Sequence, residues 1–355
     1  MADKKFAFES GEVSIAFSLI LGLGDSVVAR KVFDALIELA PNSVVDIFGI
    51  GKNHLSFAKA FYGDSKNLNG IFPRDEKFQQ VFQKYDLTLW PHSCDAIVLE
   101  WVNSERLKNT APALLESIAK IDAYNKINVY NRGVIGLNVT LRNMLISRIL
   151  NKNTFEFLSC GGALPIRDDK VNIPLAPDFK PQFDALKLGK YITIYTDIDE
   201  GEKERPKVKT WPIYYWREFV TRMKKHLPQI EIIQCGGHGD VKVENADRHF
   251  LGVDLELTKY ILANSLLHIG CEGGLVHLAT ALGTKCLVLF GSTVVHYVGY
   301  KQNINVVSEV CSPCHDILAA DNICLRGAKE PPCMLSHTPQ TVCEISCTYL
   351  KKFLD

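Results

Sequence analysis

The sequence predicts an α/β protein with two doubly wound domains in tandem, and three observations support this prediction. Apolar runs with strand character alternate with helical repeats in the first half of the chain. The alternation stops at a stretch with three prolines and little periodicity, residues 172–191, and then starts again. A chain of 355 residues is long enough for two domains of ordinary size. We therefore expect two parallel sheets covered by helices.

The first half contains one clear helical repeat among several strand candidates. The repeat covers residues 26–40 and is followed by Pro41, which suits a helix end. The predicted strands cover residues 13–21, 43–51, 94–102 and 126–133. These elements define an N-terminal Rossmann-like domain over residues 1–175.

The second half repeats the pattern over residues 186–337. The predicted strands cover residues 191–198, 230–237, 266–270 and 285–291. The predicted helices cover residues 212–228, 256–265 and 274–283. Pro212 suits a first helical turn, and Pro228 lies past the end of that helix. Residues 338–355 predict a terminal amphipathic helix.

Composition excludes several classes of protein. Lys and Arg total 40, as do Asp and Glu, so the formal net charge is zero and bulk capture of nucleic acid or anionic membrane is disfavoured. No apolar run reaches the ~18 residues of a spanning helix, and the polar start resembles no signal peptide. Eleven cysteines without an export signal favour reduced thiols. We expect a cytoplasmic protein with no nucleic-acid partner and at most peripheral membrane contact.

The first candidate site is "LGLGDSVVA", residues 21–29. Gly22 and Gly24 permit a tight turn after the strand, but Val27 stands where a dinucleotide fingerprint needs its third glycine. Asp25 stands where a pyrophosphate would approach, which also disfavours a dinucleotide cofactor. Two interpretations of Asp25 stay open. It is either a helix N-cap or a carboxylate at a strand end that acts as a general base.

Three further candidates lie in the second half. In "GCEGG", Gly273 and Gly274 open a helix whose N–H groups suit a phosphate, although Glu272 is itself an anion. His277 lies one turn further on, facing either a ligand or the core. Candidate phosphate donors elsewhere are Lys209 in "KVKTWP" and the hydroxyls of Ser292 and Thr293 in "FGST". A solvated lysine and ordinary turn chemistry are the alternatives.

A set of four cysteines follows the last predicted strand. They are Cys311, Cys314, Cys324 and Cys333. One C-x-x-C with two later thiols suits a structural zinc or iron site, with His315 as a further candidate, but a second C-x-x-C is missing. Reduced thiols that pack a loop are the alternative.

With these residues in view, the chain resembles glycosyltransferase family 9, the ADP-heptose:lipopolysaccharide heptosyltransferases. Four segments carry the resemblance in order. They are the G-D loop with its helix and second strand, "KTWPIYYW", "GCEGGLVHLATALGTKCLVLFGST" and the tail "CSPC…C…CM". The usual Asp-[Ser/Thr]-Gly of the third segment is Glu272-Gly273-Gly274 here. This departure bears on the identity of the donor sugar.

The resemblance implies a GT-B fold, with two Rossmann-like domains facing a central cleft and a terminal helix that crosses back to the first domain. It implies an inverting transfer that requires no metal, with the acceptor on the first domain and the nucleotide sugar on the second. Asp25 then matches the base that deprotonates the acceptor, supported by Gly24. Donor-binding roles fall to the glycine loop, Lys209 and Thr293, and to Asp240 on the ribose, with Glu244 behind it.

The expected partners are an ADP-linked sugar and a glycan, glycolipid or protein acceptor. Arg74, Arg132 and Arg142 are candidates for acidic groups on an acceptor, or structural residues. The expected location is the cytoplasm or the inner face of the inner membrane. Alternatives are a protein O-heptosyltransferase, a nucleotide-sugar epimerase or hydrolase, and a degenerate member that binds donors without turnover.

Overall fold

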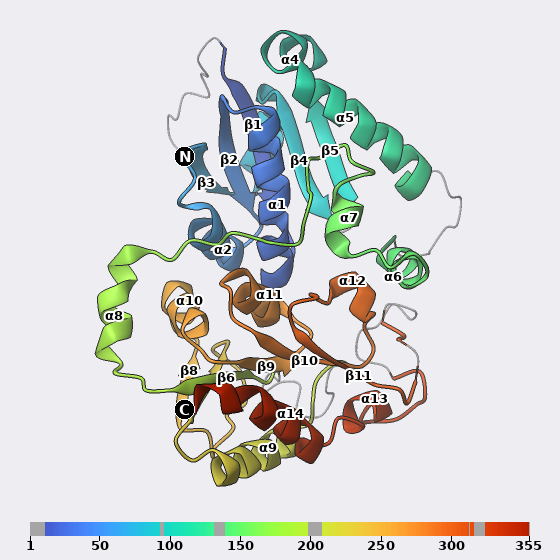
Figure 1. The fold of residues 1–355 in the computed structure, drawn as a ribbon. Coiled ribbons are helices and arrows are strands. Elements are labelled where there is room, and N and C mark those ends of the chain that lie inside the picture. Colours follow the sequence, from blue (N-terminus) through green and yellow to red (C-terminus); the bar gives the residue numbers. More distant parts are fainter. Residues whose placement is uncertain are drawn as a thin grey trace. The chain divides into compact units, whose positions relative to one another are not determined.

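The computed structural model describes residues 11–92, 96–130, 139–197, 208–311, 313–315 and 324–354 (Figure 1). The chain divides into two compact units, which are described separately. The first holds residues 1–143 and 152–174, and the second holds residues 144–151 and 175–355. The main division therefore falls at Pro174, inside the proline-containing stretch.

The first unit is built on a five-stranded sheet with the order β3-β2-β1-β4-β5. Its strands are β1 Val13–Leu19, β2 Ser43–Gly49, β3 Leu68–Pro73, β4 Leu87–His92 and β5 Ala96–Val102. The first four are parallel, and β5 pairs antiparallel with β4. Every residue of β1 is buried, as expected for a central strand that is covered on both faces.

The first unit's sheet is flanked by helices (Figure 1). They are α1 Leu23–Leu39, α2 Lys52–Tyr62, α3 Glu76–Val81, α4 Ser104–Thr110, α5 Pro112–Asn125 and α7 Thr154–Leu158. A 3₁₀ turn covers Phe82–Lys84, and α6, Val139–Leu150, spans the division between the units.

The strand predicted at residues 126–133 is wrong. Lys126–Tyr130 form a π-helical turn that continues α5, and residues 131–133 lie outside the described residues. Five residues of apolar and polar alternation do not separate strand from helix, and the preceding helix decides the outcome. Two strands of the first unit were not predicted, and neither were β8 and β11 of the second unit, Arg248–Leu251 and Ile304–Val307. The edge strand β3 carries Asn69 and Gly70, and β4 carries Pro91, all residues that weaken the strand signal.

The second unit contains a six-stranded, fully parallel sheet with the order β11-β10-β9-β6-β7-β8. Its strands are β6 Tyr191–Tyr195, β7 Glu231–Gly236, β8 Arg248–Leu251, β9 His268–Cys271, β10 Cys286–Phe290 and β11 Ile304–Val307. From β6 the chain winds outward through β7 and β8, and it then returns to β9 on the other side. The winding direction therefore reverses between β6 and β9, where sheets of this type bind ligands.

The helices of the second unit follow the expected alternation. They are α8 Lys180–Ala185, α9 Ile213–His226, α10 Leu255–Ala263, α11 Gly274–Ala281, α12 Val295–Val298, α13 Pro332–Leu335 and α14 Pro339–Leu350. Short 3₁₀ turns cover Pro177–Phe179 and Lys351–Phe353. The prediction of an α/β protein with two mainly parallel sheets is confirmed.

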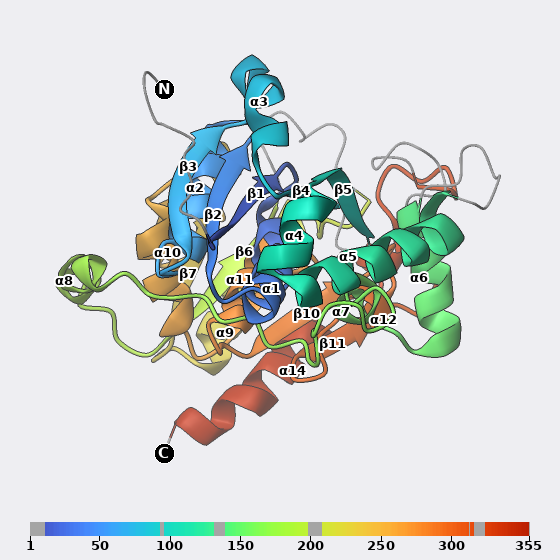
Figure 2. The same cartoon turned by 90° about the horizontal axis from the view of Figure 1, so that it is seen from above.

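The terminal helix α14 packs within the second unit. Val342, Cys343 and Leu350 join the core cluster that also contains Met223 of α9. Figure 2 shows α14 leading to the C-terminus of the chain. Its expected crossing to the first domain concerns how the two units are placed, and it stays a prediction. Among the described residues, no helix is both long enough and apolar enough to span a bilayer.

Candidate active site

The reversal between β6 and β9 brings two acidic residues to one edge of the second unit's sheet. Tyr195 at the end of β6 pairs with Gly270 of β9, so the residues after both strands lie side by side. Asp197 follows β6 and Glu272 follows β9. A Cβ atom built on Gly273 would lie 4.0 Å from the Asp197 Oδ2 atom. The carboxyl ends of the two strands therefore converge on the glycine loop.

The glycine loop caps α11 with backbone alone. Gly273 is the N-cap residue, its backbone is extended, and no side chain caps the helix. A helix start without a side-chain cap offers N–H groups and the positive end of the helix dipole to an anion. The predicted roles of Gly273 and Gly274 suit this geometry.

Glu272 is a buried carboxylate paired with a cation. Its side chain is 10% exposed, and its Oε2 atom lies 3.4 Å from Nζ of Lys209, which is 26% exposed. Burial raises the pKa of Glu272, but the charges of Lys209, His277 and His315 together outweigh burial and lower it. Glu272 is thus held ionised, and it serves as a counter-ion within the loop. A carboxylate is tolerated in the predicted anion site because Lys209 neutralises the charge of Glu272.

The buried tryptophan of the K-T-W-P segment holds the backbone next to Lys209 in place. The Trp211 indole Nε1 donates to the His337 carbonyl at 2.8 Å, and its ring meets Trp216 edge-on at 4.8 Å between centroids. The backbone of Trp211 also hydrogen-bonds to the Cys271 thiol, one residue before Glu272. Both tryptophans are fully buried. The aromatic residues of the motif therefore anchor the cation beside the strand end.

His277 packs in the core and also lies near the candidate ligand site, the two positions that the sequence left open. Its Nδ1 atom lies 2.8 Å from the Tyr300 hydroxyl, and the residue is buried on α11. It also lies near enough to Glu272 to lower the pKa of that carboxyl group. His277 is therefore a packed histidine at the edge of the candidate site.

The turn after β10 carries two buried hydroxyls without a partner. Ser292 is 1% exposed and Thr293 is 4% exposed. Neither side-chain oxygen has a hydrogen-bond partner within the described part of the chain. A buried hydroxyl left unsatisfied costs about 1–3 kcal/mol, so such groups in a strand-end turn point to a ligand.

The loop after β7 uses Asp240 to close its own turn. Asp240 Oδ2 accepts from the Gly237 N–H at 2.8 Å, and a Cβ on Gly236 would lie 2.1 Å from the same oxygen. Asp240 also lies near Tyr195, whose pKa burial and the charges of Asp197 and Asp240 raise. Its carboxylate thus stands at the strand edge, as the predicted ribose role requires. The nearby Glu244 forms an exposed bidentate pair with Arg217, at 2.7 Å for both contacts.

Asp197 lies at the candidate site, and sequence reasoning missed it. Its φ angle is 53°, in the left-handed region that aspartate tolerates better than most residues. Its Oδ1 atom accepts from the Tyr195 hydroxyl at 2.8 Å. The neighbouring Thr196 is fully buried, and its hydroxyl has no hydrogen-bond partner among the described residues. The only available signal was the strand-to-loop position in "YITIYTDI", which resembles an ordinary turn.

In the first unit, Asp25 lies in the first turn of α1 and its N-cap interpretation is wrong. The N-cap is Gly22, and Asp25 is the third helical residue because the helix starts earlier than its apolar repeat suggests. A Cβ on Gly22 would lie 3.4 Å from Asp25 Oδ2, so the carboxylate lies over the helix start. Gly24 is a buried member of the same turn.

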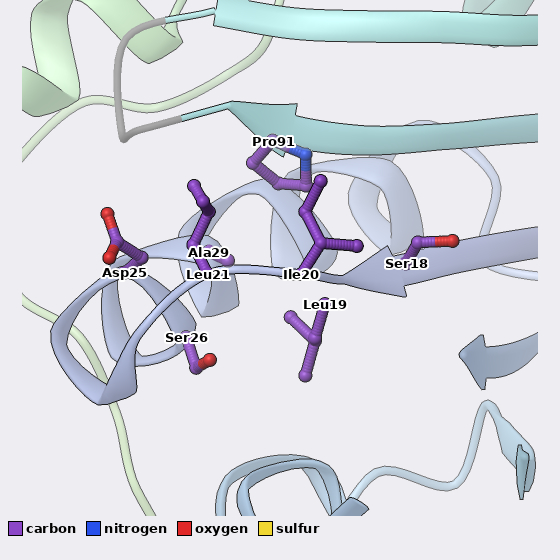
Figure 3. Close-up of a pocket in the computed structure, with 8 residues that line it drawn as sticks. All are labelled: Ser18, Leu19, Ile20, Leu21, Asp25, Ser26, Ala29 and Pro91. Atoms are coloured by element: carbon purple, nitrogen blue, oxygen red, sulfur yellow. The ribbon is translucent and has the colours of Figure 1, made fainter. Parts of the chain in front are cut away.

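A small pocket adjoins Asp25. Figure 3 shows Asp25 at one end of this pocket and Ser18 at the other. Its volume of about 10 Å³ is close to the room that one water molecule needs. The pocket is lined by Ser18, Leu19, Ile20, Leu21, Asp25, Ser26, Ala29 and Pro91. The carboxylate therefore stands at the carboxyl edge of the sheet, where a general base would be needed.

The candidate acceptor arginines are engaged within the protein where the structure describes them. Arg74 Nε donates to Ser18 Oγ at 3.2 Å, its Nη2 atom pairs with Glu100 Oε1, and its guanidinium lies over the ring of Phe78. Arg142 donates to Asn143 Oδ1 at 3.2 Å. Arg132 lies outside the described residues. Arg74 thus has a structural role beside the Asp25 pocket.

The four cysteines of the tail lie near one another. Burial raises the pKa of Cys333 to about 12, helped by the charge of Cys311 and a hydrogen bond to it. Burial also raises the pKa of Cys314, and the charges of Cys311 and Cys324 add to this. No group of three or more His, Cys, Asp or Glu side chains has metal-binding geometry within the described residues. The four thiols thus lie near one another, and a metal bound by them stays a prediction.

Two Rossmann-like sheets, with a cation, a glycine loop and buried hydroxyls at the strand ends of the second, define a GT-B protein. Residues 182–321 match the family model described as glycosyltransferase family 9 (heptosyltransferase). This match confirms the resemblance and the enzyme class, glycosyltransferase, that the motifs predict. No curated protein matches the chain.

Solved structures show the same fold at low sequence identity. A glycosyltransferase of family 9 from Veillonella parvula has a TM-score of 0.61 and 14% identity, covering 98% of this chain and 99% of that one. The ADP-heptose lipopolysaccharide heptosyltransferase II of E. coli has a TM-score of 0.59 and 13% identity, covering 97% and 100%. The iron-containing dodecameric glycosyltransferase TibC from enterotoxigenic E. coli has a TM-score of 0.63 and 13% identity, covering 96% and 77%.

Proposed function

We propose that this protein transfers a sugar, heptose from ADP-heptose, to a hydroxyl of a bacterial surface glycan such as lipopolysaccharide core. The observation that supports this most strongly is the second unit's loop. An ionised Glu272, its partner Lys209 and the uncapped start of α11 meet at the reversal point of a Rossmann sheet. Those residues lie within or beside the region that matches the family model.

The proposed donor site stabilises the leaving group without a metal. As the glycosidic bond breaks, negative charge grows on the diphosphate. The N–H groups at Gly273 and Gly274 and the ammonium of Lys209 are fixed donors for that charge. The Ser292 and Thr293 hydroxyls gain the partner that the protein does not provide. Asp240 accepts from the ribose hydroxyls.

Asp25 is the proposed general base. Its carboxylate takes the proton from an acceptor hydroxyl while that oxygen attacks the anomeric carbon, and the nucleoside diphosphate leaves from the opposite side. This single displacement inverts the anomeric centre. The position of Asp25 at a pocket on the strand edge supports the role.

The test compares Asp25→Asn with Asp122→Asn as a matched control in the same unit. Asp122 forms an exposed i,i+4 pair with Lys126, which contributes little to stability. We expect Asp25→Asn to bind ADP-heptose normally and to transfer at least about 100-fold more slowly, the scale of a lost general base. Asp122→Asn should retain full transfer. Normal transfer by Asp25→Asn would show that another group is the base.

A protein acceptor is a second candidate for the transfer, and the structural similarity to TibC is consistent with it. TibC is also described as iron-containing, and this chain holds four thiols near one another. From the sequence pattern we propose that Cys311, Cys314, Cys324 and Cys333 supply thiolate ligands to a structural zinc or iron, although within the described residues these side chains are not placed to hold a metal ion. Elemental analysis of protein purified without added metal tests this. A stoichiometric metal that is lost in a Cys311→Ser variant supports the site, and its absence assigns the thiols to packing.

A further inference from the structure

The loop after β11 returns to the end of β10. The backbone N–H groups of Cys314 and His315 both donate to the Ser292 carbonyl, at 2.8 and 2.9 Å. Two hydrogen bonds to one carbonyl fix the loop against the turn that carries the unpartnered hydroxyls. The segment that contains the C-x-x-C therefore places the backbone of His315 against the turn after β10, at the carboxyl edge of the sheet.

The thiol cluster packs directly against that same turn. A Cβ atom built on Gly291 would lie 3.1 Å from Cys333 Sγ and 2.3 Å from Met334 Sδ. Cys333 in turn hydrogen-bonds to Cys311. Only a residue without a side chain allows this approach. Cys333 and Met334 therefore pack directly against the turn at Gly291.

The charges around the glycine loop do not suit a diphosphate without further help. Asp197, Glu272 and the cation Lys209 all lie close to Cys271. Among the described groups close to Cys271, two carboxylates and one ammonium leave one negative charge in excess before the imidazoles of His277 and His315 are counted. A diphosphate beside two carboxylates meets like charge, which costs binding free energy. N–H donors beside the ligand offset this cost.

Two imidazoles lie near Glu272, and they differ in their surroundings. The Nδ1 atom of His277 forms a hydrogen bond with the Tyr300 hydroxyl. His315 lies close enough to Glu272 to act on the carboxylate, on the loop fixed to Ser292. The Ser292 and Thr293 hydroxyls lie on the turn that holds this loop, buried and without partners in the described chain. A polar ligand at this turn would give both hydroxyls a hydrogen-bond partner.

We propose that His315 is a further donor-binding residue, which presents an imidazole N–H to the diphosphate of the nucleotide sugar. The cysteine loop is the element that carries it there. This inference rests on the proposed function, because it requires a nucleoside diphosphate in the site. It gives the C-x-x-C segment a role in donor binding, whether or not its thiols hold a metal.

The test is calorimetric titration of three probes, ADP, pyrophosphate and adenosine, into wild type and variants. His315→Ala removes the donor, and His315→Asn retains an N–H of similar reach. His226→Ala is the matched control, because His226 lies exposed at the end of α9. Thermal melting confirms that each variant is folded.

We expect His315→Ala to weaken ADP and pyrophosphate about tenfold, the scale of one hydrogen bond to a charged group, with adenosine unchanged. His315→Asn should recover much of the affinity, and His226→Ala should match wild type. Equal loss of ADP and adenosine would reduce His315 to a structural role, and unchanged ADP affinity would remove it from the site. Wild type that binds neither ADP nor pyrophosphate would overturn the proposed function, and this inference with it.

Discussion

Replacing Lys209 by Met tests the ion pair at the centre of the candidate site. Two unit charges 3.4 Å apart attract by about 5 kcal/mol at an effective dielectric constant of about 20. Breaking a buried pair costs about 3–5 kcal/mol, because one charge stays buried without its partner. Lys209 is a quarter exposed, and His277 and His315 still face Glu272, so we expect a loss of about 2–3 kcal/mol. That corresponds to about 5–10 °C in the melting temperature of the second unit.

The matched variant is the double change Lys209→Met with Glu272→Gln. It removes the stranded charge, so its melting temperature should return to within about 3 °C of wild type. ADP binding should stay weak in both variants, because the cation is absent from both. Differential scanning calorimetry and ADP titration measure the two effects separately. Equal melting of wild type and Lys209→Met would refute the argument that Glu272 is a buried anion held by this lysine.

Three further predictions follow from single residues. Burial lowers the pKa of His268 in the folded protein to about 3, whereas an unfolded histidine titrates near about 6.5. The unfolded chain therefore takes up the proton first as the pH falls. Below about pH 6.5 the free energy of unfolding should decrease, by at most about 1.4 kcal/mol per pH unit. A His268→Gln variant should therefore show a shallower decline in melting temperature between pH 6.5 and pH 4, and an unchanged slope contradicts this. Glu272, with its lowered pKa, stabilises the protein above the pKa of about 4.3 that it has when unfolded, and the contribution is lost as pH falls through its folded pKa. Melting of wild type and Glu272→Gln should therefore converge towards pH 3, whereas a constant gap would remove the charge from the explanation. Gly291→Ala should destabilise the second unit by about 1–3 kcal/mol and weaken ADP, because its methyl group overlaps Met334. Unchanged melting and ADP affinity would show that the turn adapts freely.

The sequence predicts the elements of this protein well where the apolar period is long. α1, α9 and α11, and the buried strands β1 and β6, lie where their patterns indicate. Short or mixed signals fail, as at residues 126–133, where a helix continues through an apparent strand. Local propensity does not decide such segments because their neighbours do.

The motifs of the candidate site were predicted separately. The contacts between residues of different motifs were not predicted. Lys209 and Glu272 are 63 positions apart, and only the parallel order of β6 and β9 brings their surroundings together. The same holds for His315, which the sequence offered as a further metal candidate and which lies near enough to Glu272 to lower the pKa of that carboxyl group. Asp197 gave only the weak signal of a strand-to-loop position, because its unusual backbone angle is invisible in the residue letters.

Calorimetric titration of ADP-heptose into the wild-type protein, with UDP-glucose as the comparison, measures directly whether this protein binds an ADP-linked donor. We expect one binding site per chain for ADP-heptose, competition by ADP, and affinity at least about tenfold lower in Lys209→Met, because a charge-assisted hydrogen bond is lost. Absence of binding by ADP-heptose and ADP, or binding that Lys209→Met leaves unchanged, would contradict this expectation.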